Sequence, residues 1–172
     1  MNVKKLDKWA HLPARATQMS AGYDLYANLR DEDTQKIEVI TPGETKKIGT
    51  GVAVAIPNGY FGAIFARSGL ATNQGLRPAN CVGVIDADYR GELIVPIHND
   101  SGERRYINHG DRIAQLVLIP YAVFEEIKEV DDLDETERGW GGFGSTGDGI
   151  CDECRITYTD RLTDTDGKEL WV

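Results

Sequence analysis

Short runs of alternating or continuous apolar residues recur through the first two thirds of the chain. They lie at residues 36–40, 46–56, 60–66, 80–85, 93–98, 105–107 and 112–124. Turn-forming clusters separate them at residues 41–43, 58–59, 100–102 and 108–110. Short strands at this spacing, with turns between them, predict an all-β sandwich or closed barrel.

Helical periodicity is confined to one short stretch. Residues 68–74 predict one or two helical turns, with the Ser68 hydroxyl as N-terminal cap and Gly75 as the stop. Beyond residue 124 the pattern gives way to an acidic stretch and then to residues 138–147, of which half are glycine. Such a segment forms no stable element alone, so we expect a ligand to order it.

The composition indicates where in the cell this β-rich chain is located. The 172 residues suffice for one domain with a hydrophobic core, and the hydrophobic fraction of 41% is that of an ordinary soluble protein. The N-terminal residues contain no apolar run long enough for a signal peptide or a membrane span. Three cysteines, with Cys81 alone in an apolar stretch, argue against a disulfide framework. We therefore expect a cytoplasmic protein that does not bind membranes.

The net charge of −9 is concentrated in two segments. Residues 125–137 carry −7 and residues 148–172 carry −4, which leaves +2 for the rest of the chain. Acidic segments of this kind favour solubility and argue against sequence-independent binding of nucleic acid. They leave the remaining residues free to bind a smaller anion.

The tripeptide Arg67-Ser68-Gly69 follows a predicted strand and opens the predicted helix. There, backbone N–H groups, a hydroxyl and a guanidinium would point at an anion, which suits a phosphate. A surface arginine beside an ordinary helix cap explains the tripeptide too, and from the tripeptide alone we favour that explanation.

Residues 80–91 place an apolar strand directly before Asp86, Asp88 and Tyr89. A carboxylate at the end of a buried strand is well placed to act as a general base for water. A turn in which the carboxylates accept bonds from backbone donors while Tyr89 covers the core accounts for the same pattern. The residues alone leave both interpretations open.

Two polar residues interrupt strand-like runs. Asp24 lies within residues 21–25, where a charge requires a partner, either an arginine or a hydrated ion. Gln115 lies within residues 110–116, where its amide would bond either a phosphate or a neighbouring strand. In isolation the second explanation is the simpler one for Gln115.

The glycine-rich segment carries Arg138, Phe143, Ser145 and Thr146. A cation, a flat ring and two hydroxyls on a flexible backbone are the groups needed to close over a nucleotide. A plain linker has a similar composition, but the single phenylalanine among glycines favours a function.

Taken in order, these five segments resemble the five motifs of the trimeric dUTPase family. The matching residues are 21–27, 66–71, 80–91, 110–116 and 138–147. The resemblance implies a distorted jelly-roll-like β-barrel with a short helix at most. It also implies a homotrimer in which segments of all three subunits build each active site.

The same resemblance implies Mg²⁺-dependent hydrolysis of dUTP to dUMP and pyrophosphate. Asp86 would be the general base that deprotonates a water for attack on the α-phosphorus. Asp24 would help to hold the hydrated Mg²⁺–triphosphate region through pairing and water. Mg²⁺ would neutralise phosphate charge and fix the geometry of the attack.

The family pattern also assigns substrate contacts. Arg67, Ser68 and Gln115 would bind phosphates. The Asn80 side chain and the backbone up to Val84 would pair with uracil, and Tyr89 would lie beneath the deoxyribose. Phe143 would stack on the base while Arg138 reaches the γ-phosphate. The full set expected to bind substrate is Arg67, Ser68, Gly69, Asn80, Val84, Tyr89, Gln115, Arg138, Phe143, Gly144 and Ser145.

We therefore expect a β-barrel core with an acidic connector at residues 1–137, a closing motif at 138–147 and an acidic extension at 148–172. The resemblance does not cover the extension, which contains Cys151 and Cys154. Their spacing is half of a zinc-ribbon pattern. Free thiols are the simplest interpretation, ahead of a local disulfide or of zinc shared between subunits or with a protein partner.

Two other functions compete with dUTP hydrolysis as explanations of the sequence. A dCTP deaminase would share the fold and the Arg-Ser motif but needs a catalytic glutamate where this chain has Pro96, with Glu92 out of register. Proline cannot transfer a proton, which disfavours deamination. A non-enzymatic regulatory relative would be expected to lose Asp86, Arg67 or Phe143, and all three are present.

Overall fold

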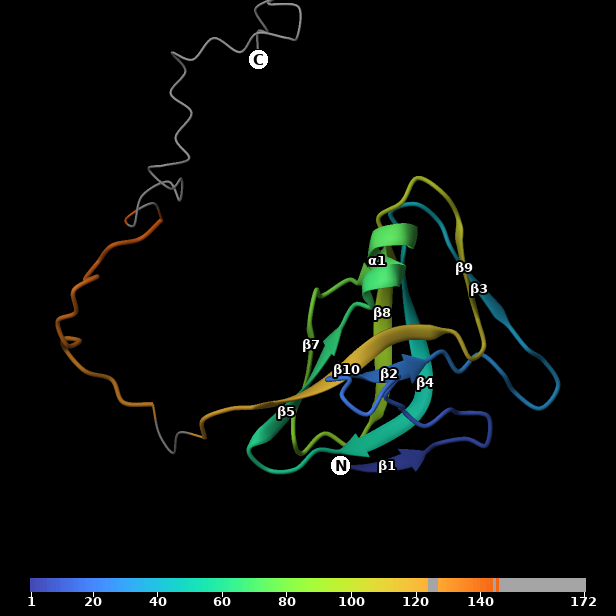
Figure 1. The fold of residues 1–172 in the computed structure, drawn as a ribbon, viewed down its shortest axis with the longest axis horizontal. Helices are drawn as coiled ribbons and strands as arrows, with labels where there is room; N and C mark the ends of the chain where they lie inside the picture. The colour runs from blue at the N-terminus through green and yellow to red at the C-terminus, as the bar shows by residue number, and fades with distance from the viewer. Residues whose placement is uncertain (124–126, 144, 146–172) are drawn as a thin grey trace, which may run out of the picture. The chain divides into compact units, whose positions relative to one another are not determined.

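The computed structural model describes residues 1–123, 127–143 and 145 (Figure 1). The chain divides into two compact units, Met1–Glu125 and Glu126–Val172. Every regular element of the described residues belongs to the first unit. The strands are β1 (Asn2–Lys5), β2 (Tyr23–Tyr26), β3 (Ile37–Ile40), β4 (Thr45–Ala55), β5 (Tyr60–Phe65), β6 (Leu76–Pro78), β7 (Gly83–Ile85), β8 (Glu92–Asn99), β9 (Arg105–Asn108) and β10 (Arg112–Pro120). The helix α1 spans Ser68–Gln74.

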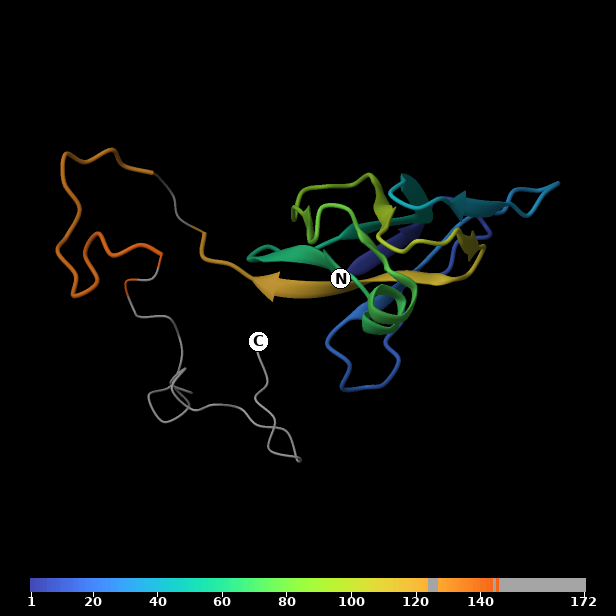
Figure 2. The ribbon, with the colours of Figure 1, turned by 90° about the horizontal axis from the view of Figure 1, so that it is seen from above.

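The strands pair antiparallel in three sheets. One four-stranded sheet has the order β1-β4-β8-β6, and the other has the order β2-β10-β5-β7. A separate pair, β3-β9, lies at one edge of the unit in both views (Figure 1, Figure 2). The all-β, distorted jelly-roll-like architecture with one short helix confirms the prediction from the sequence.

Alternating side chains build the hydrophobic core. On β8, Leu93, Val95 and Ile97 are fully buried, whereas the intervening residues lie on the outer face. Leu25 on β2 and Leu116 on β10 bring the second large sheet into the same cluster. Because a strand presents successive residues to opposite faces, this period of two explains why the sequence pattern located the long strands well.

Two predicted strands differ from the observed ones. The run 80–85 forms a strand only from Gly83, because Cys81 has a φ of 61° in the left-handed region, which no strand residue adopts. The run 112–124 forms β10 as far as Pro120, and Phe124 lies outside the described residues. The short strands β1 and β6 were not predicted, since each is too short to show alternation.

The helix α1 has the predicted bounds but not the predicted cap. Arg67 is the N-cap residue, in extended conformation, and no side chain caps the helix. Ser68 is the first helical residue, so the prediction that its hydroxyl caps the helix was wrong. Gly75 ends the helix as expected, with a φ of 68° and its N–H bonded to the carbonyls of Ala71 and Leu70.

Helix α1 is seven residues long. In the described ranges, no helix has the length and apolar character needed to cross a membrane.

Candidate active site

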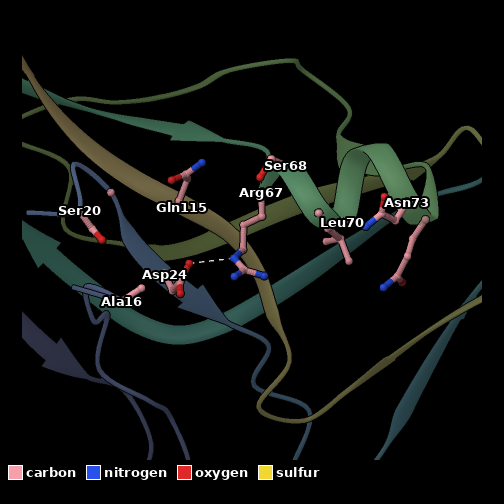
Figure 3. A pocket seen from close by; sticks show the side chains of 11 residues that line it. Ala16, Ser20, Asp24, Arg67, Ser68, Leu70, Asn73 and Gln115 are labelled. Atoms are coloured by element: carbon pink, nitrogen blue, oxygen red, sulfur yellow. Dashed lines mark hydrogen bonds and ion pairs between the residues drawn. The ribbon is translucent and has the colours of Figure 1, made fainter.

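A cavity of about 450 Å³ lies where β2, β10 and the start of α1 meet (Figure 3). We call it the arginine cavity, defined by its charged and polar residues Asp24, Arg67, Ser68 and Gln115. The remaining lining residues are Ala16, Ser20, Gly22, Gly69, Leu70, Asn73 and Gln74. Residues from three of the five sequence motifs thus come together in one place.

Asp24 is the charged centre of this region. Its Oδ1 accepts a bond from Arg67 Nε at 2.8 Å, and its Oδ2 accepts one from Arg112 Nη1 at 3.2 Å. Its side chain is only 12% exposed. A buried carboxylate requires such partners, and of the two kinds of partner that the sequence allowed, an arginine or a hydrated ion, the structure shows two arginines.

Gln115 faces Asp24 directly across the β2-β10 pair. Its Nε2 donates to the carbonyl of Ala66 at 2.9 Å, which fixes the amide beside the start of α1. A Cβ on Gly22 would lie 2.6 Å from Gln115 Oε1. Glycine at position 22 therefore lets β2 approach the amide, and the side chain of Gln115 keeps its place in the cavity.

Ser68 and Gly69 form the first turn of α1 at the edge of the arginine cavity. Because no side chain caps α1, the Ser68 hydroxyl is not engaged by the amides of its own helix. A Cβ on Gly69 would meet nothing within 4 Å, so the space beside it is open. Backbone amides and a hydroxyl here suit an oxyanion.

A second cavity, of about 730 Å³, contains Asp86. We call it the aspartate cavity. Its lining residues are Asn58, Phe61, Val84, Asp86, Ala87, Asp88, Arg90 and Tyr121. Asp86 directly follows β7, and its carbonyl accepts the N–H of Tyr89 at 3.1 Å in a tight turn. This turn sets the carboxylate at the end of the strand, as the sequence predicted.

Tyr89 lies flat over the chain just beyond this turn. Its hydroxyl donates to the carbonyl of Glu92 at 3.1 Å. A Cβ on Gly91 would collide with the tyrosine ring. Glycine at position 91 therefore permits the ring to lie against the backbone, with 43% of the residue exposed.

The segment before β7 contains a strained turn. Val82 donates its N–H to the carbonyl of Asn80 at 2.6 Å across Cys81, whose φ is 61°. This is the pattern of the rare classic γ-turn, and it holds a non-glycine residue in an unfavourable region. Asn80, whose carbonyl accepts this bond, is an exposed residue.

The structure does not unite all the predicted residues within one chain. The arginine cavity and the aspartate cavity have no lining residue in common. Arg138, Phe143 and Ser145 belong to the second unit, where Arg138 Nε donates to the carbonyl of Gly141 at 3.1 Å. Gly144, Cys151 and Cys154 lie outside the described residues.

The two residues that bear on deamination have structural roles. The Pro96 carbonyl accepts the N–H of Ala79, the residue that follows the last residue of β6. Because β6 has ended there, no strand residue requires the N–H that proline lacks. Glu92 Oε1 accepts the N–H of Gly51 at 2.7 Å, within the irregular register between β4 and β8. Neither residue lines either cavity of the described chain.

The arginine cavity suits a magnesium ion that is carried by phosphates. Among the described residues, no three metal-ligating side chains lie together. Both oxygens of Asp24 already bind arginines. Since Mg²⁺ keeps several waters and binds chiefly to substrate phosphates, Asp24 fits an indirect contact through water.

The fold and the cavities define an all-β protein with a jelly-roll-like barrel and a polar cavity built around the Asp24–Arg67 pair. The model of the dUTPase family matches residues 8–147. The chain belongs to the dUTPase family.

Two deoxyuridine 5'-triphosphate nucleotidohydrolases are similar in sequence to this chain over most of their length. The deoxyuridine 5'-triphosphate nucleotidohydrolase of Desulfitobacterium hafniense strain DCB-2 is 51% identical over 142 residues, covering 82% of this chain and 90% of the relative. That of Nautilia profundicola is 48% identical over 147 residues, covering 86% and 98%.

Solved structures of phage enzymes share the fold. A mutant dUTPase of Staphylococcus bacteriophage 80alpha with dUpNHpp has a TM-score of 0.71 and 33% identity, over 85% of this chain and 97% of that one. A mutant dUTPase of phage phi11 has a TM-score of 0.67 and 30% identity, over 78% and 98%. The phi11 structure reveals the coordination of a structural Mg(II) ion.

The sequence did not single out Arg112, which contacts this site through Asp24, or the lining residues Ser20, Asn73 and Gln74. Arg112 lies within the fourth motif, but only the register of β10 shows that its side chain reaches Asp24. The consecutive buried residues Ile113 and Ala114 break the alternation of β10. Two adjacent apolar residues at this point are the feature of the sequence that could have predicted an irregular strand.

Proposed function

We propose that this chain hydrolyses dUTP to dUMP and pyrophosphate, which limits uracil incorporation into DNA and supplies dUMP for dTMP synthesis. The observation that carries the proposal is the arginine cavity, where Arg67 binds Asp24 and Gln115 is held by the Ala66 carbonyl, in a member of the dUTPase family. The expected base, Asp86, is present at the end of β7. The cytoplasmic location expected from the sequence stays a prediction.

In the proposed reaction, Arg67, Ser68, Gly69 and Gln115 bind the phosphates. Arg67 gives its Nε to Asp24, so its two terminal nitrogens are the donors left for oxyanions. Asp86 accepts a proton from a water that attacks the α-phosphorus, and pyrophosphate leaves. Mg²⁺, when bound to the phosphates, supplies charge neutralisation and alignment, with Asp24 in contact through water.

Recognition of the base is assigned to residues 80–84 and to Tyr89. Asn80 is exposed beside the γ-turn at Cys81, and its side-chain amide, with backbone groups of this segment, would pair with the uracil edge. The backbone as far as Val84 would leave no room for a thymine methyl group. Tyr89, held by its bond to the Glu92 carbonyl, would support the deoxyribose and exclude a 2′-hydroxyl.

We further propose a homotrimer with shared active sites. The support is the separation of Arg67 and Asp86 into two cavities of one chain. A site that uses both residues would then combine the arginine cavity of one subunit with the aspartate cavity of another. A closed threefold assembly completes three such sites at once.

The glycine-rich segment is proposed as a closing element. Phe143 would stack on uracil, Arg138 would reach the γ-phosphate, and Gly144 and Ser145 would line the closed site. Residues 148–172 are proposed to bind a protein partner, with Cys151 and Cys154 as free thiols. Metal analysis of the purified protein with and without Cys151→Ser tests the zinc alternative.

The test of the function is pyrophosphate release from dUTP, dCTP, dTTP and UTP, each with and without Mg²⁺. We expect turnover of dUTP alone, and only with the metal. Ammonia release from dCTP would instead identify a deaminase. Equal hydrolysis of dUTP and UTP would contradict the assigned role of Tyr89.

A further inference from the structure

Arg112 binds Asp24 from outside the arginine cavity. Its Nη1 lies 3.2 Å from Asp24 Oδ2, whereas Arg67 Nε occupies Oδ1 at 2.8 Å. Arg112 is absent from the residues that line the cavity, and its side chain is 48% exposed. It therefore contacts the site through Asp24.

A bulge in β10 aims Arg112 at Asp24. Gln115 pairs with Asp24 and Ala114 with Leu25, but Arg112 pairs with Tyr26, so Ile113 is the extra residue. In a regular strand Ile113 would share the face of Gln115, and Arg112 would point to the core. The bulge reverses this, burying Ile113 at 1% exposure and placing Arg112 on the face of Asp24.

This inference rests on the proposed function and adds one residue to it. We propose that Arg112 is a positioning residue for dUTP hydrolysis: it holds Asp24, and Asp24 in turn aims the free Nη groups of Arg67 at the phosphates. With one carboxylate oxygen bound to each arginine, Asp24 has no spare orientation. Removing Arg112 frees Oδ2 and lets the carboxylate and Arg67 rotate together.

The second arginine also balances charge. A lone Asp24–Arg67 pair would have no net charge and would set a carboxylate near the incoming triphosphate. With Arg112, the three groups carry a net +1 close to the phosphates. Since phosphates are bound in both the ground state and the transition state, losing this arrangement should weaken binding more than it slows the reaction.

The first experiment measures steady-state kinetics of Arg112→Gln in the full-length chain. We expect KM for dUTP to rise about tenfold while kcat stays within about twofold. Arg104→Gln, which removes the same charge from an exposed loop position, is the matched control and should leave KM unchanged. An equal rise in both variants would overturn the proposal, because the effect would then be one of overall charge.

Arg112→Lys keeps the charge but offers a single ammonium instead of a planar fork. We expect KM between those of the wild type and Arg112→Gln. Thermal unfolding of each variant monitors the fold, and Arg112→Lys provides the comparison if Arg112→Gln does not fold. A lysine variant with wild-type stability and wild-type KM would overturn the geometric part of the proposal.

A double-mutant cycle separates indirect from direct action. If Arg112 acts through Asp24, then Arg112→Gln should raise the Kd of dUpNHpp strongly in the wild type but by less than about twofold in Asp24→Asn. Equal factors in the two backgrounds would show that Arg112 acts independently of Asp24 and would overturn the inference. Failure of the wild type to hydrolyse dUTP would contradict the proposed function alone, because this cycle measures binding.

Discussion

The arginine cavity and the aspartate cavity differ in how far a single chain organises them. In the first, Asp24 binds two arginines and Gln115 is fixed to the Ala66 carbonyl. In the second, Arg90 Nη1 donates to the carbonyls of Ala87 and Tyr89 in its own turn. Among the described residues, no ion pair engages Asp86.

This difference matches what each group must do. Ligands of a phosphate chain work by orientation, and a network of bonds within one chain supplies it. A general base must instead keep its carboxylate free to accept a proton from water. One chain therefore carries one cavity with fixed side chains and one with an available carboxylate, which is the division expected if the proposed site combines two subunits.

The largest effect is expected at Asp86. Asp86→Asn should lower kcat about 10³-fold, because the amide cannot accept the proton, while the Kd of dUpNHpp changes little. Stopped-flow pyrophosphate release and calorimetric titration measure the two quantities. Asp88→Asn, which alters a second carboxylate in the same cavity, is the matched control. Similar losses in both variants would mean that charge in the cavity, not a particular base, drives the reaction.

Mixing two inactive chains tests the division between the cavities directly. Arg67→Ala and Asp86→Asn subunits, unfolded together and refolded in equal amounts, should recover about a quarter of wild-type activity, because a random trimer pairs an intact Arg67 with an intact Asp86 at one site in four. Each variant refolded alone is the control. No recovery in a well-folded mixed trimer would place both residues of a site in the same chain.

A smaller effect is expected from crowding the arginine cavity. Gly22→Ala should lower kcat/KM about tenfold, because the new methyl group displaces the Gln115 amide. Gly102→Ala, where a Cβ meets nothing within 4 Å, should have no effect. Retained activity in Gly22→Ala would show that the amide of Gln115 is dispensable for binding phosphates.

The smallest effect concerns a residue that lines neither cavity. Burial, with nearby His11 and Arg30, lowers the pKa of His109 below its ordinary 6.5, and His109 Nδ1 accepts the N–H of Leu29. The unfolded chain then binds a proton more readily than the folded one. Neutral His109 therefore stabilises the fold above pH 6.5, and this contribution is lost as the pH falls through the lowered pKa.

His109→Asn should therefore reduce the drop in Tm between about pH 7.5 and about pH 5.5 by about 1 °C. Thermal unfolding followed by circular dichroism measures it, with kcat as the check that both cavities are undisturbed. Identical pH dependence in the two proteins would contradict the assignment to His109.

The sequence predicted what depends on neighbouring residues. The period of two located the long strands, and Gly75 marked the end of α1. A charge inside a strand-like run predicted a partner for Asp24, either an arginine or a hydrated ion, and the structure shows an arginine. These features follow from local propensity and from the cost of burying an unpaired charge.

What the sequence missed depends on register between distant strands. The contact between Arg112 and Asp24 joins residues 88 positions apart and exists only because β10 contains a bulge. The false cap at Ser68 arose because serine has a high capping propensity, whereas Arg67 takes the extended conformation at that place. Likewise, alternation at residues 80–85 could not reveal the left-handed Cys81.

The bulge at Ile113 also bears on how this chain can change in length during evolution. Deleting Ile113 would leave Arg112 opposite Tyr26 and Gln115 opposite Asp24, so β10 would pair regularly and Arg112 would keep the face of Asp24. The pairing of β10 with β5 would also stay intact. The deletion would instead remove the buried side chain of Ile113 from the core. At this point of the chain, natural selection should therefore act on the packing that residue 113 supplies to the core.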